Sequence, residues 1–455
     1  MEQNQRGSFT GKLGFVLSAA GASVGLGNNW RFPYLAAKYG GGAFLLVYII
    51  LALTFGYTMI IAETAIGRST QKSPVSAFTF YSRSPLAKAG GWLNAIVPIL
   101  ICPYYSVIGG WVCKYLYAFL TTDMDTITSD TFFTDFITNG VSAEVWFCVF
   151  VALNLVIIYM GVENGIERVS RFMMPILLVL AVVISVYTIT RPGAMQGVAY
   201  LLIPHLENFS WMTVVSAMGQ MFYSLSIAMG ILITFGSYMK KDVSIEDSTR
   251  QVEFFDTAIA ILAGMMIIPA VFAFSGGDPE HLKAGPSLMF ITMPQIFKSM
   301  GFGRIIGILF FTLVLFAALT SSIALTESAV STLADEFKWS RFKCTTIMAV
   351  VMVALGTLSC LGYGPLSFIT IIGMPFLDFF DFLTNSVMMP IAALAICILV
   401  TRCMTIERVE QEVEVDGHPF RRKKIFRVMI RYIAPLFVAI ILLSSIANAF
   451  GWISM

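Results

Sequence analysis

Oxygen-bearing residues interrupt two otherwise apolar segments of the chain. The first interruption is Gly21-Ala22-Ser23-Val24-Gly25-Leu26-Gly27-Asn28-Asn29, and the weaker second is Ser224-Leu225-Ser226-Ile227-Ala228-Met229-Gly230. Backbone that unwinds at such a point inside a membrane must have its carbonyl groups satisfied by neighbours. Because alkali cations prefer hard oxygen donors, the pair of interruptions predicts a cation site. The alternative is that these small residues serve helix packing.

Further polar groups lie in other apolar segments. Thr320-Ser321-Ser322 offers three hydroxyls, which can equally bond to their own helix one turn back. Asp256 is a functional candidate because it is an ionisable residue within an apolar segment, although charged residues just before it allow an interfacial placement. Glu63 is as well explained by pinning a helix, and Glu327 and Lys114 are expected to reach the ends of their segments.

The composition indicates a membrane protein. Of 455 residues, 57% are hydrophobic and only 12% are charged, about half the share found in soluble domains. The net charge of +2 is too balanced for a nucleic-acid-binding face, so no nucleic-acid partner is expected. Seven cysteines, mostly inside apolar segments, indicate no disulfide framework.

Eleven apolar segments are long enough to cross a bilayer as helices. They cover residues 13–37, 41–67, 91–120, 144–160, 169–190, 211–239, 254–275, 305–333, 345–361, 376–401 and 429–452. Most of the 29 Lys and Arg residues fall on one side of the alternating segments, which predicts a cytoplasmic N-terminus and an outside C-terminus.

A single membrane domain, residues 1–455, is therefore expected. It would consist of spans 1–5 at about 13–190, spans 6–10 at about 211–401 and an eleventh at about 429–452. The two interrupted spans are corresponding members of two five-span halves. That arrangement is typical of a midplane binding site in secondary transporters.

The first interruption continues into a longer motif. Gly25-Leu26-Gly27-Asn28-Asn29-Trp30-Arg31-Phe32-Pro33-Tyr34 is followed by Gly40-Gly41-Gly42-Ala43-Phe44. With segments at 103–105, 219–224, 317–322 and 376–381, it resembles the neurotransmitter:sodium symporter family, particularly the bacterial multihydrophobic amino-acid transporters. The resemblance implies an all-α integral membrane protein with 11 transmembrane helices, two inverted five-helix repeats and discontinuous helices 1 and 6.

The resemblance also implies two sodium sites. The first would comprise the Ser23 carbonyl, Asn28, Ser224 and Asp256, and the second the carbonyls of Gly21, Val24 and Ala317 with the hydroxyls of Thr320 and Ser321. The substrate site would comprise Ser23, Gly25, Gly27, Ile101, Tyr105, Phe222, Tyr223, Ser226, Met229, Ser321 and Leu325.

The substrate class follows from the same resemblance. Tyr105 would hold a substrate carboxylate, and Gly25 would leave room for it, where amine-transporting relatives carry Asp. The largely apolar pocket indicates leucine, methionine or an aromatic amino acid. Sodium-coupled symport of a neutral hydrophobic L-amino acid is therefore expected, in a bacterial inner membrane and as a monomer or weak dimer.

Two charged pairs would form the gates. The resemblance pairs Arg31 with Asp381 at the outer gate and Arg6 with Asp335 at the inner gate, beside Tyr238. Phe9 departs from the Trp usual near the inner gate, which leaves the packing at that end open.

Chloride is not expected as a second ion. In chloride-dependent relatives the anion lies among five side chains, and the aligned residues here are Tyr48, Gln220, Ser224, Asp256 and Ala260. Asp256 replaces an Asn of those relatives, and Ala260 replaces a Ser. A fixed carboxylate at Asp256 would supply the negative charge beside two sodium ions. Proton counter-transport through the same carboxylate is a further hypothesis.

A non-transporting membrane sensor or a membrane-embedded enzyme on the same fold is the alternative. An enzyme is not expected, because His205, His281 and His418 all lie in loops and no HExxH motif occurs. A channel is left open by the sequence.

Overall fold

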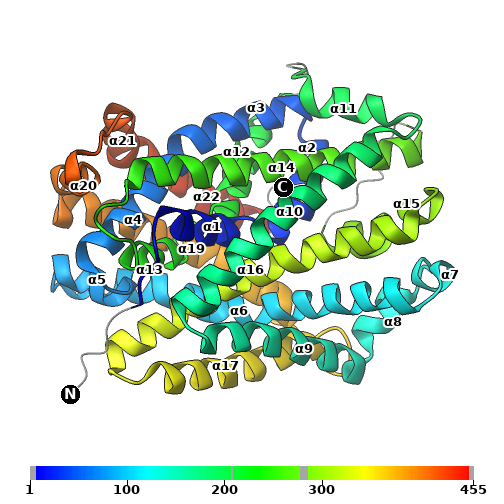
Figure 1. The fold of residues 1–455 in the computed structure, drawn as a ribbon, viewed down its shortest axis with the longest axis horizontal. Helices are drawn as coiled ribbons and strands as arrows, with labels where there is room; N and C mark the ends of the chain where they lie inside the picture. The colour runs from blue at the N-terminus through cyan, green and yellow to red at the C-terminus, as the bar shows by residue number, and fades with distance from the viewer. Residues whose placement is uncertain (1–6, 206, 208, 277–284, 450–455) are drawn as a thin grey trace.

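The computed structural model describes residues 7–205, 207, 209–276 and 285–449 (Figure 1). Helices dominate this part of the chain, whose strand-like pairings are the isolated bridges Gly41–Pro204 and Ile371–Met374. Nine helices in the described part are long and apolar enough to cross a membrane. The first and sixth spans are each split in two, which is consistent with the predicted total of eleven and confirms the all-α membrane fold.

The first half contains five spans and several short helices. The first span is split into α1 (Lys12–Ser23), η1 (Gly27–Arg31) and α2 (Phe32–Lys38), and the second consists of α3 (Gly42–Leu51), η2 (Ala52–Gly56) and α4 (Tyr57–Thr70). The third span is α6 (Pro85–Thr121), preceded by the short helix α5 (Pro74–Tyr81), and the fourth is α9 (Gly140–Tyr159), preceded by α7 (Met124–Ile127) and α8 (Phe132–Thr138). The fifth span consists of η3 (Val162–Glu167) and α10 (Arg168–Ile189) and is followed by α11 (Ala194–Leu202).

The second half repeats the pattern and adds a last span. The sixth span is split into α12 (Trp211–Ser224) and α13 (Ile231–Ser237), and the seventh is α14 (Ile245–Ser275). The eighth span is α16 (Gly303–Phe337), preceded by η6 (Leu288–Thr292) and α15 (Met293–Ser299), and the ninth is α17 (Arg341–Leu361). The tenth span consists of α18 (Phe376–Asp381), η7 (Phe382–Met388), α19 (Met389–Ile398) and η8 (Leu399–Met404), and the eleventh, which follows α20 (Ile406–Val413) and η9 (Val415–Gly417), consists of α21 (Lys423–Val428), η10 (Met429–Ile433) and α22 (Ala434–Ala449).

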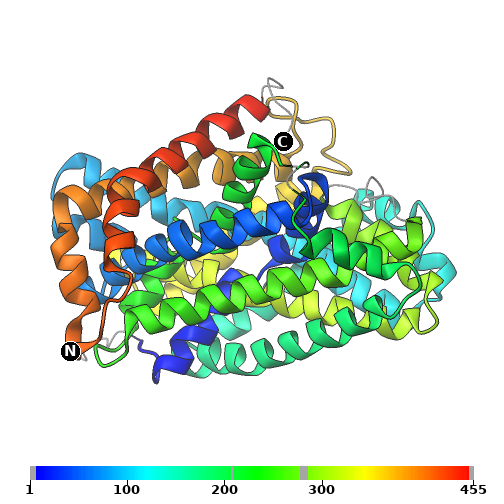
Figure 2. The same cartoon turned by 90° about the horizontal axis from the view of Figure 1, so that it is seen from above.

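The long helices run side by side along the longest dimension of the molecule. Figure 1 shows α5, α20 and α21 at one end and α7, α8, α11 and α15 at the other. Figure 2 shows α22, in red, at the edge of the bundle. Within it, α6 packs against α16, α9 and α17, and α1 packs against α14, α16 and α10. Both halves of the chain therefore contribute to one core around α1.

Several helices are longer than hydropathy predicts. The seventh span begins at Ile245 rather than residue 254, because the Ser244 side chain caps it by accepting a hydrogen bond from the Asp247 amide at 3.2 Å. The first turns of α14 contain charged residues, so a prediction from hydropathy does not include them in the span. Asp256 consequently lies well inside the helix and is 0% exposed, which excludes the interfacial placement.

The prediction for Glu327 was wrong. Because α16 extends to Phe337, Glu327 lies more than two turns from its end and is fully buried. Its carboxylate accepts hydrogen bonds from Arg341 of α17 at 2.6 and 2.8 Å and from the Tyr238 hydroxyl at 2.7 Å. Arg341 also donates to the Ile158 carbonyl of α9 at 2.9 Å. This ion pair therefore joins four spans, with the Glu327 carboxylate buried and the Arg341 guanidinium partly exposed.

Removing only one partner of this pair should leave a buried charge unpaired. Arg341→Met is expected to lower the free energy of unfolding by about 3 kcal/mol, the low end of the usual range because the arginine is partly exposed. Replacing both partners, as Glu327→Met with Arg341→Met, should restore most of that loss. Thermal and denaturant unfolding in detergent measure both changes. A double variant whose loss equals the sum of the losses measured for Arg341→Met alone and for Glu327→Met alone would contradict this account.

Candidate functional site

The first break is stabilised by the two asparagines that follow it. The chain leaves the helix at Val24, where the backbone is extended (φ −78°, ψ 93°). The Gly25 amide then donates to the Asn28 side-chain oxygen at 3.2 Å, and the Asn29 side chain donates to the Gly25 carbonyl at 2.9 Å. Asparagine side chains thus replace helical bonds that the unwound backbone has lost. The carbonyls at the end of α1 stay available to other partners.

The second break is more strained. Ser226 and Ala228 adopt left-handed backbone conformations (φ 53° and 59°), each costing on the order of 1–2 kcal/mol in a non-glycine residue. Gly230 is also left-handed, and a Cβ there would lie 2.8 Å from the Asn94 carbonyl oxygen. Glu63 of α4 accepts a hydrogen bond from the Ala228 amide at 2.8 Å. Glu63 therefore pins the unwound segment.

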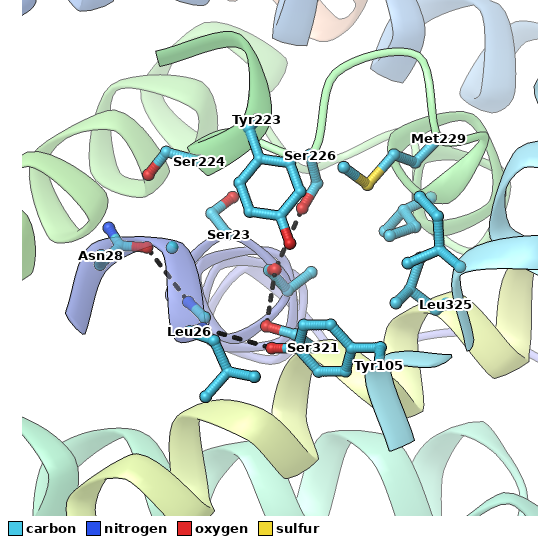
Figure 3. Close-up of a pocket in the computed structure, with 15 residues that line it drawn as sticks. Ser23, Leu26, Asn28, Tyr105, Tyr223, Ser224, Ser226, Met229, Ser321 and Leu325 are labelled. Atoms are coloured by element: carbon cyan, nitrogen blue, oxygen red, sulfur yellow. Dashed lines mark hydrogen bonds between the residues drawn. The ribbon is translucent and has the colours of Figure 1, made fainter. Parts of the chain in front are cut away.

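A small cavity lies between the two breaks (Figure 3). Its volume is about 30 Å³, room for about one water molecule. It is lined by Ala22, Ser23, Gly25, Leu26, Gly27, Asn28, Ile101, Tyr105, Tyr223, Ser224, Ser226, Met229, Ile231, Ser321 and Leu325. Ten of the eleven residues expected at the substrate site line this cavity, and Phe222 does not. Phe222 lies instead on the wall of an outer cavity.

Two hydroxyls from opposite sides of this cavity converge on one carbonyl. Ser226 and Ser321 each donate to the Ala22 carbonyl oxygen at 3.0 Å (Figure 3). Tyr105 accepts a hydrogen bond from the Leu26 amide at 3.3 Å, which leaves the tyrosine O–H hydrogen for another acceptor. Sequence reasoning missed Ala22 and Leu26, because they act through backbone atoms and their side chains carry no signal.

Asp256 accepts hydrogen bonds from three polar side chains beside this cavity. One carboxylate oxygen accepts hydrogen bonds from the Asn28 side chain at 2.9 Å and the Ser224 hydroxyl at 2.8 Å. The other accepts one from the Tyr48 hydroxyl at 2.8 Å. All four side chains are at most 2% exposed. Of the four predicted ligands of the first sodium ion, Asn28 and Ser224 are therefore both within hydrogen-bonding distance of Asp256, and Ser23 lines the adjoining cavity.

The predicted residues of the second sodium site also meet. The Ser321 hydroxyl lies 3.3 Å from the Gly21 carbonyl oxygen and 3.4 Å from that of Val24. On the preceding residue, the Thr320 hydroxyl lies within its own helix at 3.0 Å from the Phe316 carbonyl oxygen and 3.2 Å from that of Ala317. Carbonyls from the end of α1 thus face hydroxyls of α16. This donor set has the hard-oxygen chemistry that sodium prefers.

An outer cavity of about 380 Å³ lies beyond Tyr105 and Tyr223, which line both cavities. Arg31 and Asp381 both line it, but among the described residues they form no ion pair with each other. The Arg31 guanidinium lies over the Tyr223 ring, 5.6 Å from its centroid. Asp381 accepts hydrogen bonds from Asn385 at 2.6 Å and Tyr104 at 3.2 Å.

The expected inner gate is only partly described. Arg6 lies outside the described residues. Asp335 accepts a hydrogen bond from the Ser73 amide at 2.7 Å, and Tyr238 is bound to Glu327 as noted above. Phe9 is buried edge-on against Phe235 and Tyr238, with centroids 5.5 and 6.0 Å away. An aromatic packing role at this position is therefore retained without the Trp.

Comparison with known proteins decides the family. The model of the "Sodium:neurotransmitter symporter family" matches residues 6–139 and 135–451. The chain belongs to this family. An uncharacterized sodium-dependent transporter of Bacillus subtilis is 32% identical over 98% of this chain and 99% of its own length. The sodium- and chloride-dependent GABA transporter 2 of Homo sapiens is 28% identical over 73% and 62%.

A solved structure supports the same assignment. The crystal structure of MhsT in complex with L-phenylalanine is 35% identical to this chain, with a TM-score of 0.86 and coverage of 97% of this chain and 100% of the other. The protein is therefore a multi-pass membrane transporter that couples to sodium, and it is not an enzyme.

Gly25 should be intolerant of any side chain. An added Cβ would lie 2.9 Å from the Ser321 hydroxyl and 3.1 Å from that of Tyr105, inside a cavity with almost no spare volume. Gly25→Ala is expected to raise the KM of sodium-driven uptake about tenfold. Gly219→Ala is the matched control, since its Cβ would meet nothing within 4 Å. Equal KM values for the two variants would contradict the proposed place of Gly25 in the site.

Proposed function

We propose that this transporter is a symporter of neutral hydrophobic L-amino acids, with leucine, methionine and aromatic amino acids as its substrates. The observation that carries the proposal is the partly apolar, partly polar lining of the small cavity between the two helix breaks. Ile101, Met229 and Leu325 give that cavity an apolar side, while backbone groups of the breaks give it a polar side. MhsT, the structural relative at 35% identity, was crystallised with L-phenylalanine.

The two ends of the broken first span suit a zwitterion. The C-terminal end of α1 presents carbonyls and the partial negative charge of a helix dipole, which favour an ammonium group. The segment that begins at Gly27 presents amides and a partial positive charge, which favour a carboxylate. Tyr105, with its O–H hydrogen available, would donate to that carboxylate. Gly25 leaves the space in which the carboxylate would sit.

Two sodium ions would bind beside the substrate. Asp256, Asn28, Ser224 and the Ser23 carbonyl would hold the first, and the Gly21, Val24 and Ala317 carbonyls with Thr320 and Ser321 would hold the second. Two ions crossing about 100 mV supply about 4.6 kcal/mol. A tenfold sodium gradient adds about 1.4 kcal/mol per ion, which together would sustain roughly a 10⁵-fold gradient of a neutral substrate.

Alternating access would expose this site to one side at a time. The outer cavity ends at Tyr105 and Tyr223, and closing it would bring Arg31 and Asp381 together. The inner side would open by releasing Tyr238 and the Arg6–Asp335 pair. The chain would act as one domain over residues 1–455, with its N-terminus cytoplasmic and its C-terminus outside, in a bacterial inner membrane and as a monomer or weak dimer.

Uptake into proteoliposomes tests the proposed function. Radiolabelled leucine and phenylalanine should accumulate under an inward sodium gradient and not when potassium replaces sodium. Each should be competed by the other, because both would occupy the same apolar pocket. Accumulation without sodium, or no accumulation of any apolar amino acid, would contradict the proposal.

Chloride should be dispensable because Asp256 would supply the negative charge near the two ions. Its carboxylate accepts hydrogen bonds at 2.8 Å from the hydroxyls of Ser224 and Tyr48. These two residues occupy the positions that hold chloride in chloride-dependent relatives. Replacing chloride by gluconate is expected to leave wild-type uptake unchanged. Asp256→Asn should reduce uptake at least tenfold in gluconate and recover in part in chloride. Asp247→Asn, on the partly exposed first turn of the same helix, is the control. Collapse of wild-type uptake in gluconate would overturn the assignment.

A further inference from the structure

A third cavity lies beside the first turns of α14, away from the substrate site. Its volume is about 480 Å³, and it shares no lining residue with the cavity between the breaks. It is lined by Lys12, Ile49, Leu53, Asp247, Arg250, Gln251, Glu253, Phe254, Thr257 and Arg422. These residues come from α1, α3, η2, α14 and the segment just before α21.

The charges of this cavity do not cancel. Lys12, Arg250 and Arg422 contribute three positive charges, and Asp247 and Glu253 contribute two negative charges, so one positive charge remains. Among the described residues, Lys12 forms no ion pair. Arg250 approaches a carboxylate oxygen of Asp247 only to 3.8 Å. A net charge of +1 favours an occupant that carries a net charge of −1.

One buried oxygen in this cavity lacks a hydrogen-bond donor. Glu253 is 3% exposed; one carboxylate oxygen lies 3.5 Å from Arg422, and the other has no partner in the described part of the chain. Arg422 is held in place by the Leu53 carbonyl at 3.3 Å and by the Tyr57 ring at 4.8 Å. An unpaired buried acceptor costs about 1–3 kcal/mol, so a ligand that donates a hydrogen bond there would be stabilised.

Polar and apolar groups are separated along the bilayer direction. Arg250 lies six residues before Asp256 in α14, about 9 Å nearer the end of the bundle. Ile49 follows Tyr48, which contacts Asp256, so Ile49 lies deeper than Arg250, whereas Leu53 lies beside Arg422. Leu53 and Phe254, which also line the cavity, are 42% and 69% exposed. Along α14, the charged residues Asp247, Arg250 and Glu253 thus come before the apolar Phe254, the order in which a phospholipid presents its headgroup and acyl chains.

We propose that this cavity binds an anionic phospholipid of the phosphatidylglycerol type. Its phosphate would pair with Lys12 and Arg250, and a headgroup hydroxyl would donate to the free oxygen of Glu253. One acyl chain would lie along Leu53 and Phe254. Phosphatidylcholine has no donor for Glu253 and no net charge. Phosphatidylethanolamine has a donor, but it too carries no net charge to match the cavity.

Native mass spectrometry of the detergent-solubilised protein tests this site. The protein is titrated with phosphatidylglycerol, phosphatidylethanolamine and phosphatidylcholine that share the same acyl chains. One phosphatidylglycerol should bind at least fivefold more tightly than either of the others. Lys12→Gln with Arg250→Gln should weaken that binding about 25-fold, about fivefold for each cation. Arg83→Gln with Lys88→Gln, two exposed cations beside the start of α6, is the matched control.

Each outcome decides the proposal. Equal affinities for the three lipids, or equal losses in the site and control variants, would overturn it. Displacement of the lipid by glycerol phosphate at equal concentration would also overturn it, since the occupant would then be a soluble phosphate. If the double variant does not fold, judged by its thermal midpoint in detergent, the single variants Lys12→Gln and Arg250→Gln decide, each with a loss of about fivefold expected.

Discussion

The structure depends most on a carboxylate buried in the membrane-spanning core. Asp256 is fully buried, and no Lys or Arg in the part of the chain that the structure describes forms an ion pair with it. Its hydrogen-bond donors are neutral: Asn28 beyond the first break, Ser224 before the second, and Tyr48 of α3. A buried charge without a cation is costly, so this arrangement gains most from a bound cation. The two broken spans meet where that cation would sit.

Glu63, like Asp256, supports the break in the sixth span. Asp256 holds the end of α12 through Ser224, and Glu63 holds the unwound segment through the Ala228 amide. The left-handed conformations of Ser226 and Ala228 need such support, because neither residue is glycine. In return, Ser226 reaches across to the Ala22 carbonyl of the first span. Strain in one break is thus compensated by hydrogen bonds that define the cavity.

Much of this arrangement follows from the sequence, and the exceptions have physical reasons. Glycine, serine and asparagine inside apolar segments located both breaks, and the family motif located the residues around them. Hydropathy placed the start of α14 too late because its first turns are charged. It also placed Glu327 near solvent, because an apolar run cannot show that α16 continues to Phe337. Contacts made by backbone atoms, such as those of Ala22 and Leu26, leave no mark on residue types.

The central claim is that Asp256 couples substrate binding to one sodium ion. The most direct test is the dependence of leucine affinity on sodium concentration, measured in detergent for the wild type and for Asp256→Ala. With two coupled ions, the affinity should rise with nearly the second power of sodium concentration below saturation in the wild type. In the variant it should rise with the first power, because only the site at Gly21, Val24 and Ser321 would remain. An unchanged power in the variant would contradict the claim.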